Sequence, residues 1–133
     1  MSKYILHVDD DDDDRLFLEE EFLKQTNCTF LSFRGGSELL AFLAAHPRAQ
    51  ICLLVADMNM PQMSGMEILR AIRANPDLSD LPVIMFTTSS SPHDRNEAAN
   101  LGARMFTKPT TLALLQAAVT QMLAFAGVDT LRP

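Results

Sequence analysis

The uncharged run "ICLLVA", residues Ile51 to Ala56, is the most informative stretch of this chain about its fold. The run has the length of an ordinary strand, and an acid, Asp57, follows it directly. A strand without a polar face must be covered on both sides, and the helices that flank a parallel sheet provide that cover. We therefore predict that Ile51–Ala56 lies at the centre of a parallel sheet.

Outward from this run, apolar segments of strand length alternate with segments of helical period. The predicted strands are Tyr4–Val8, Thr29–Phe33, Ile51–Ala56, Pro82–Phe86 and Met105–Lys108. The predicted helices are Arg15–Gln25, a segment around Leu39 and Leu43, Gly65 to Asn75, Ser91 to Gly102, and Leu112 to Gly127. This alternation predicts an α/β fold, a doubly wound five-stranded parallel sheet with five helices on its two faces.

The length and composition predict a single domain and exclude several classes of protein. The chain has 133 residues, of which 47% are hydrophobic, so we expect one domain over residues 1–127 and a short C-terminal tail over 128–133. A net charge of -6 argues against binding to nucleic acid or to an anionic membrane surface. Cys28 and Cys52 lack the spacing of a zinc site or a disulfide framework, and we expect buried thiols.

No apolar run approaches the roughly 20 residues that cross a bilayer. The N-terminus also lacks the charged-then-apolar layout of a signal peptide. We therefore expect a cytoplasmic protein with no membrane contact.

Chemically active side chains lie at the carboxyl ends of four of the predicted strands. Asp9 and Asp10 follow the first strand, Asp57 the third and Thr87 the fourth, and Lys108 ends the fifth. In doubly wound sheets the ligand site lies beyond the carboxyl ends of the strands. We therefore expect three carboxylates, a hydroxyl and an ammonium to meet at one edge of the sheet.

This set of groups predicts a magnesium site that supports phosphoryl transfer. Three neighbouring carboxylates repel one another unless a hard cation neutralises them, and oxygen-only ligation suits Mg2+. One carboxylate could then attack a phosphoryl group, while the cation and the lysine offset charge on the phosphoryl oxygens. The product would be an aspartyl phosphate.

Several motifs in this order resemble the receiver domain of bacterial two-component response regulators, in particular its single-domain, CheY-like members. The motifs are V-D-D followed by Arg15, "ADMNMPQMSG" with Pro61 and Gly65 at fixed offsets from Asp57, "VIMFTTSS" and "TKP". Together they span nearly the whole chain, and several spaced motifs are more specific than any single one. The resemblance implies a flavodoxin-like sheet with the strand order 2-1-3-4-5 and a receiver domain over residues 1–127.

The resemblance also implies a role for each site residue. Asp57 would be the phosphoryl acceptor, and Thr87 and Lys108 would contact the phosphoryl oxygens. The Mg2+ ligands would be Asp10 directly, Asp9 through water, Asp57, and the backbone carbonyl of Asn59.

The function implied is a signalling switch that catalyses its own phosphorylation and dephosphorylation and is not otherwise an enzyme. The phosphoryl donor would be a histidine kinase or a histidine phosphotransfer protein. Phosphorylation would reorganise the face formed by helix 4, strand 5 and helix 5. Since no effector domain follows Gly127, we expect output through a separate downstream effector or onward phosphotransfer.

The sequence leaves two alternative functions open. The first is a constitutive protein-binding module of the same fold in which the phosphorylation chemistry is unused, although the intact site residues argue against it. The second is a phosphatase or hydrolase that uses Asp57. Asn59 stands two residues later, where such an enzyme would need a second acid.

Three further interpretations concern individual polar residues. We expect Asp11–Asp14 to lie outside the site, where they cap the following helix and complement its dipole. We expect His7 to be a hydrogen-bonded core histidine. His93 and Glu97, four apart on a helix, are better explained as solvent-facing residues than as metal ligands.

Two sequence positions are expected to tune the switch. Ser89 lies two residues after Thr87 and, with Asn59, occupies a position that governs hydrolysis of the acyl phosphate in the family, while Thr88 could narrow access to the phosphoryl group. Most receivers carry an aromatic residue three before the lysine. Counting back from Lys108 places Met105 there, whereas counting forward from Gly102 places Phe106, and we favour Met105.

Overall fold

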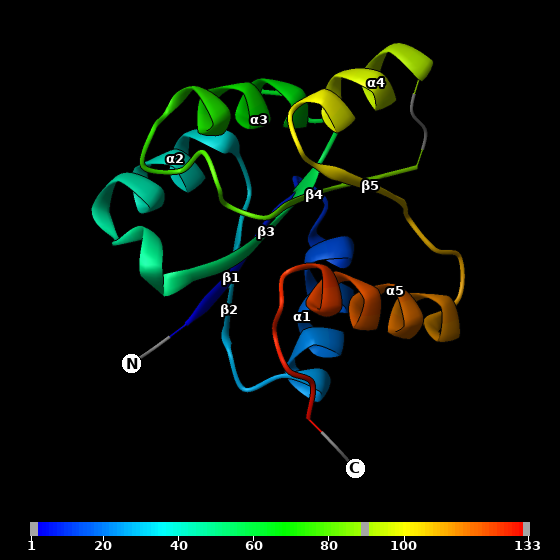
Figure 1. The fold of residues 1–133 in the computed structure, drawn as a ribbon. Coiled ribbons are helices and arrows are strands. Elements are labelled where there is room, and N and C mark those ends of the chain that lie inside the picture. Colours follow the sequence, from blue (N-terminus) through cyan, green and yellow to red (C-terminus); the bar gives the residue numbers. More distant parts are fainter. Residues whose placement is uncertain (1–2, 89–90, 132–133) are drawn as a thin grey trace.

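The computed structural model describes residues 3–88 and 91–131, in which strands and helices alternate along the chain (Figure 1). The strands are β1 (Tyr4–Val8), β2 (Thr29–Phe33), β3 (Ile51–Asp57), β4 (Val83–Thr87) and β5 (Arg104–Thr107). The α-helices are α1 (Asp12–Gln25), α2 (Gly36–Ala45), α3 (Gly65–Ala74), α4 (Pro92–Asn100) and α5 (Leu112–Phe125). A short 3-10 helix, Arg48–Gln50, precedes β3.

The five strands form one parallel sheet in the order β2-β1-β3-β4-β5. Helices α1 and α5 cover one face, and α2, α3 and α4 cover the other (Figure 1). This arrangement confirms the predicted fold class, including the central position of β3 between β1 and β4.

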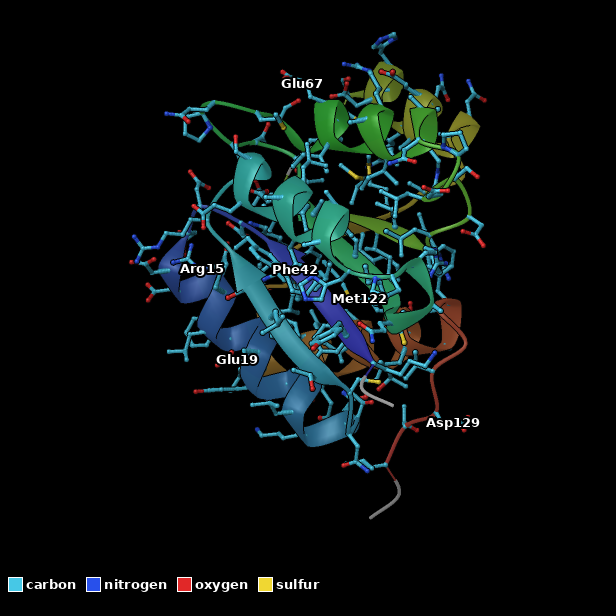
Figure 2. All side chains as sticks on the ribbon, turned by 90° about the vertical axis from the view of Figure 1, so that its left-hand side faces the viewer. Arg15, Glu19, Phe42, Glu67, Met122 and Asp129 are labelled. Atoms are coloured by element: carbon cyan, nitrogen blue, oxygen red, sulfur yellow. The ribbon has the colours of Figure 1, made fainter. Side chains whose placement is uncertain are left out.

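The core consists of two apolar layers, one on each face of the sheet, and side chains fill both layers (Figure 2). Strand β3 contributes to both. Leu54 and Ala56 pack toward α2, α3 and α4, whereas Leu53 and Val55 pack toward α1 and α5. Because side chains alternate along a strand, a charge at any of these positions would be buried in one layer or the other. This explains why the run is uncharged.

Helix α1 begins three residues earlier than predicted, at Asp12. The carboxylate of Asp11 accepts a hydrogen bond from the backbone N–H of Asp14 at 3.0 Å and caps the helix. Asp12, Asp13 and Asp14 therefore form the first helical turn, where the helix dipole favours negative charge. The acidic run is therefore part loop and part first helical turn, which confirms the predicted capping role of this segment.

The segment after α5 packs back onto the domain. The backbone N–H of Val128 donates to Leu123, and that of Leu131 donates to the carbonyl of Gln25 at the end of α1. No helix in the described ranges is long and apolar enough to cross a membrane. Ser89, for which a role in hydrolysis is predicted, lies outside the described residues.

Gly65 allows α3 to start against the end of β3. A Cβ at this position would collide with the backbone carbonyl oxygen of Asp57 and would lie 2.7 Å from Cε of Met85. The N–H of Gly65 also donates to the carbonyl of Met58 at 3.1 Å, which fixes the turn after the strand. The loop that carries Asn59 is thus held closely to Asp57.

We expect Gly65→Ala to lower the free energy of unfolding by about 1–3 kcal/mol, because a backbone oxygen cannot move aside as a flexible side chain would. Chemical denaturation measures the change. Gly35→Ala is the matched control, since an added Cβ there meets nothing within 4 Å. Equal losses in the two variants would show that the close approach at Gly65 does not matter.

Candidate functional site

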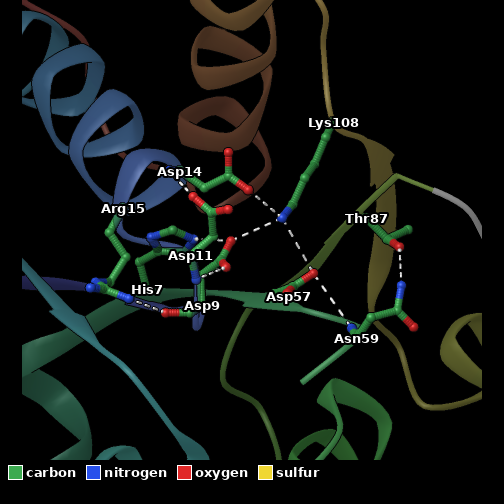
Figure 3. A network of polar contacts seen from close by, with 9 residues as sticks. All are labelled: His7, Asp9, Asp11, Asp14, Arg15, Asp57, Asn59, Thr87 and Lys108. Carbon is green, nitrogen blue, oxygen red and sulfur yellow. Dashed lines mark hydrogen bonds and ion pairs between the residues drawn. The ribbon is translucent and has the colours of Figure 1, made fainter. Parts of the chain in front are cut away.

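The carboxyl edge of the sheet brings together the residues that the sequence singles out. Asp9 follows β1, Asp57 ends β3, Thr87 ends β4, and Lys108 follows β5 (Figure 3). The backbone N–H of Lys108 donates to the carbonyl of Thr87 at 2.7 Å, which continues the β4–β5 pairing to the site. The predicted convergence of these groups is therefore present in the fold.

Asp9, Asp10 and Asp57 form a compact acidic cluster. One carboxylate oxygen from each lies within 4.8 Å of the others. Asp9 is fully buried, Asp57 is 5% exposed and Asp10 is exposed. The cluster is therefore open to solvent on the side of Asp10 and closed behind Asp9.

Burial makes the two inner acids hard to ionise. Loss of solvent raises the pKa of Asp9 to about 6, although hydrogen bonds from the Asp11 N–H and from Lys108 oppose the shift. Burial also raises the pKa of Asp57, and the nearby Lys108 ammonium opposes it. A cation held by these oxygens would favour the ionised forms, and three carboxylates are the hard donor set that Mg2+ prefers. The residues present fit a magnesium ion.

Lys108 is bound by three carboxylates. Its Nζ lies 2.7 Å from Oδ2 of Asp14, 3.0 Å from Oδ2 of Asp9 and 3.4 Å from Oδ1 of Asp57. Burial alone would lower the pKa of Lys108, but hydrogen bonds to Asp14 and Asp9 raise it above its usual value. Lys108 is therefore a cation in direct contact with the acidic cluster.

The prediction that Asp14 lies outside the site is wrong. Asp14 is in the first turn of α1 and points toward Lys108 (Figure 3). Residues four apart share a face of a helix, and Leu18 and Phe22 are buried on the core side of α1. The spacing Asp14, Leu18, Phe22 is the sequence signal that indicates the inward direction of Asp14. By contrast, Asp11 caps the helix as predicted, and Asp13 is exposed.

His7 lies behind Asp9 in the core, but it is not hydrogen-bonded as predicted. Within the described part of the chain, neither ring nitrogen has a hydrogen-bond partner, and Nε2 lies 3.7 Å from Oδ2 of Asp9. Burial, together with the positive charges of Lys108 and Arg15, lowers the pKa of His7 to about 3. His7 is therefore a neutral core residue behind Asp9, and the centre of the Phe30 ring lies 6.0 Å from the centre of its imidazole ring.

Asn59 and Arg15 hold the loops around the cluster. The backbone N–H of Asn59 lies 3.5 Å from Oδ1 of Asp57, and its side-chain amide lies 3.5 Å from the hydroxyl of Thr87. Arg15 donates from Nη1 to the carbonyl of Asp9 at 2.7 Å and pairs with Asp12. The roles predicted for the Asn59 carbonyl and for Thr87 stay predictions.

Met105 and Phe106 lie on opposite faces of β5. Met105 packs toward the layer of α2, α3 and α4, and Phe106 packs toward the layer of α1 and α5. The guanidinium of Arg104 lies 5.2 Å from the centre of the Phe106 ring. Met105 as the residue of the switch position stays a prediction.

Glu97 is engaged by an arginine. Its carboxylate accepts two hydrogen bonds from Arg70, at 2.6 and 2.7 Å, and His93 is exposed. This agrees with the interpretation of His93 and Glu97 as surface residues.

Comparison with known proteins gives a family match over most of the chain. Residues 5–120 match the family described as the response regulator receiver domain. Response regulator Rcp1 of Synechocystis sp. is 34% identical over 99 residues, covering 69% of this chain and 66% of that protein. A probable cyclic di-GMP phosphodiesterase of Vibrio cholerae is 34% identical over 116 residues, covering 86% of this chain but 25% of that protein.

A solved structure of the Mn2+-bound form of response regulator Rcp1 is similar with a TM-score of 0.80 and 29% identity, covering 92% of this chain and 93% of that one. This chain thus spans two thirds or less of the length of both curated relatives.

Removing one carboxylate of the cluster should weaken Mg2+ binding much more than removing a neighbouring carboxylate. We expect Asp10→Asn to raise the Kd for Mg2+ at least about tenfold, since it deletes a hard oxygen donor. Asp13→Asn removes the same charge from an exposed residue and should change Kd by about twofold or less. Calorimetric titration measures both. Equal losses would mean that the acidic run binds cations diffusely.

Asp9 should also make the metal-free protein sensitive to pH. Its folded pKa of about 6 exceeds the ordinary value of 3.8 for an aspartate side chain. This acid therefore stabilises the fold fully only below about pH 4, and that stabilisation is lost as the pH rises through 6. Asp9→Asn should therefore raise the unfolding free energy at pH 7.5 by about 1–2 kcal/mol and much less at pH 4. Denaturation at both pH values without divalent cations checks this, and an equal effect at both would contradict it.

Proposed function

This chain belongs to the response regulator receiver domain family, and on that basis we propose that it is a signalling switch that accepts a phosphoryl group on Asp57 in a Mg2+-dependent reaction. The observation that carries the proposal is the position of the Lys108 ammonium, 3.4 Å from the Asp57 carboxylate beside the acidic cluster. In this arrangement a nucleophile, a fixed cation and a metal-binding donor set lie within one small space.

The proposed chemistry is nucleophilic attack by a carboxylate. An oxygen of Asp57 attacks the phosphorus of a phosphohistidine, a P–O bond forms, and the P–N bond breaks with its electron pair passing to the imidazole nitrogen. Burial removes the water that would stabilise the Asp57 anion, and Lys108 offsets part of this cost. Thr87 lies at the end of the adjacent strand, where its hydroxyl could donate to a phosphoryl oxygen.

Asp9, Asp10, Asp57 and the carbonyl of Asn59 would hold the magnesium ion. When bound, the cation neutralises the carboxylates and draws charge from the phosphoryl oxygens. The Mn2+-bound structure of Rcp1, at 29% identity, supports divalent binding in a related chain. Asn59 also orients the loop, since its N–H and its amide face Asp57 and Thr87.

We propose a histidine kinase or a histidine phosphotransfer protein as the donor, and a separate effector that contacts the face of α4, β5 and α5. On that face a cavity of about 410 Å3 is lined by the aromatic ring of Phe106 and by small and apolar residues that include Leu114, Ala117 and Ala118. Leu114 is 55% exposed. The net charge of -6 favours protein partners over nucleic acid. The chain would catalyse its own phosphorylation and dephosphorylation without acting on another substrate.

A constitutive binding module is the second candidate function. The same apolar surface on β5 and α5 could bind a partner without any phosphorylation. In that case the carboxylates and the lysine would be structural. The two functions differ in whether Asp57 takes up phosphate and whether partner binding depends on it.

Phosphorylation on Asp57 can be tested directly. Incubation with Mg2+ and acetyl phosphate or phosphoramidate should add one phosphoryl group to the intact mass, and chelation of Mg2+ should abolish the addition. Asp57→Asn keeps the size of the side chain, removes the nucleophile and should show no mass increase.

Asp13→Asn is the control and should be phosphorylated like the wild type. Phosphorylation of Asp57→Asn at an unchanged rate would reject the assignment of the acceptor. No phosphorylation of the wild type under any of these conditions would favour the binding module.

A further inference from the structure

We propose that Asp14 is a positioning residue that holds Lys108 in the unphosphorylated protein and competes with the phosphoryl group for it. This inference rests on the proposed function, and it concerns regulation of the same site. It adds a residue of helix α1 to a site otherwise built from the ends of the strands.

The geometry gives Asp14 the shortest of the three contacts of Lys108. The Nζ–Oδ2 distance is 2.7 Å to Asp14, against 3.0 Å to Asp9 and 3.4 Å to the nearer oxygen of Asp57. The Lys108 side chain is 13% exposed and that of Asp14 is 37% exposed. A charge-assisted hydrogen bond that is partly shielded from water is stronger than an ordinary surface ion pair.

The position of Asp14 is fixed by helix α1. The N–H of Asp14 donates to the capping carboxylate of Asp11, and the N–H of Asp11 donates to Oδ1 of Asp9 at 2.9 Å. One turn later, Leu18 is buried in the layer between α1 and α5. Since the backbone of this turn is tied at both ends, Asp14 could approach Asp57 only by rotation of its own side chain.

Lys108 must therefore divide its three N–H donors among competing acceptors. The oxygens of Asp9 belong to the cluster that fits Mg2+, and a bound cation would neutralise their negative charge. Asp14 lies outside that cluster and keeps its charge. When phosphoryl oxygens appear on Asp57, Asp14 is the carboxylate that still opposes movement of the lysine toward them.

The alternative is that Asp14 acts only through its charge, as any acid near the site would. Asp13 allows the two to be separated. It is the adjacent residue in the same helical turn, it carries the same charge, and it is exposed, whereas the Lys108 ion pairs are to Asp9, Asp14 and Asp57. A through-space effect should be similar for both residues, whereas a contact effect belongs to Asp14 alone.

The test uses beryllofluoride, which binds to the acceptor carboxylate as a mimic of the phosphoryl group, titrated at saturating Mg2+ and followed by 1H–15N NMR. We expect Asp14→Asn to bind it about five- to tenfold more tightly than the wild type, because one charge-assisted contact no longer has to be broken. Asp13→Asn should differ from the wild type by about twofold or less. Asp14→Ala, which also lacks the carboxylate, should reproduce the gain if Asp14→Asn folds poorly.

The same titrations in a Lys108→Met background show whether Asp14 acts through the lysine. There, Asp14→Asn and Asp13→Asn should have equal effects. A gain for Asp14→Asn that persists without the lysine, a gain shared equally by Asp13→Asn, or weaker binding in Asp14→Asn would each overturn the inference. If the wild type neither binds beryllofluoride nor takes up phosphate, the proposed function itself fails.

Discussion

The ion contacts of Lys108 join the four parts of the chain that build the site. Asp9 comes from the end of β1, Asp14 from α1 and Asp57 from β3, while the lysine itself follows β5. Without this ammonium, Asp9 and Asp57 would be carboxylates buried beside one another with no opposite charge in contact, which is costly in a medium of low dielectric constant. One cation thus makes a concentrated acidic site compatible with a folded protein.

This arrangement leaves the site incompletely neutralised. Lys108 supplies one positive charge to several carboxylates, and His7 supplies none because burial keeps it neutral. Burial raises the pKa values of Asp9 and Asp57, and the single ammonium of Lys108 offsets only part of this shift. A divalent cation would supply the missing positive charge, which is the physical reason why these residues fit a metal. Because positive charge is short, the carboxylates compete for Lys108. A stronger ion pair between the lysine and one carboxylate weakens its ion pair with another.

The remainder of the fold keeps these groups at fixed positions. β3 is buried on both faces, so Asp57 stands at the end of a rigid strand, and Gly65 lets α3 begin directly against it. The N–H of Lys108 bonded to Thr87 places the lysine in register with the neighbouring strand. Phosphorylation of such a site would act on a framework that can respond by discrete rearrangements of side chains and helix ends, because packed layers do not deform continuously.

The sequence by itself determined the doubly wound sheet, its central strand, and the meeting of Asp9, Asp10, Asp57, Thr87 and Lys108 at one edge. These follow from local pattern, because an uncharged run must be covered on both sides and parallel strands end at the same edge. The tertiary structure decided which groups touch. Asp14 and Asp13 are adjacent and identical in charge, yet only the direction set by the start of α1 brings Asp14 to Lys108. The surroundings of His7 could not be predicted from the sequence either. They are formed by residues of other elements, such as the ring of Phe30 on β2. A contact between residues 94 positions apart depends on the packing of α1 against the sheet, and no local pattern in the sequence encodes that distance.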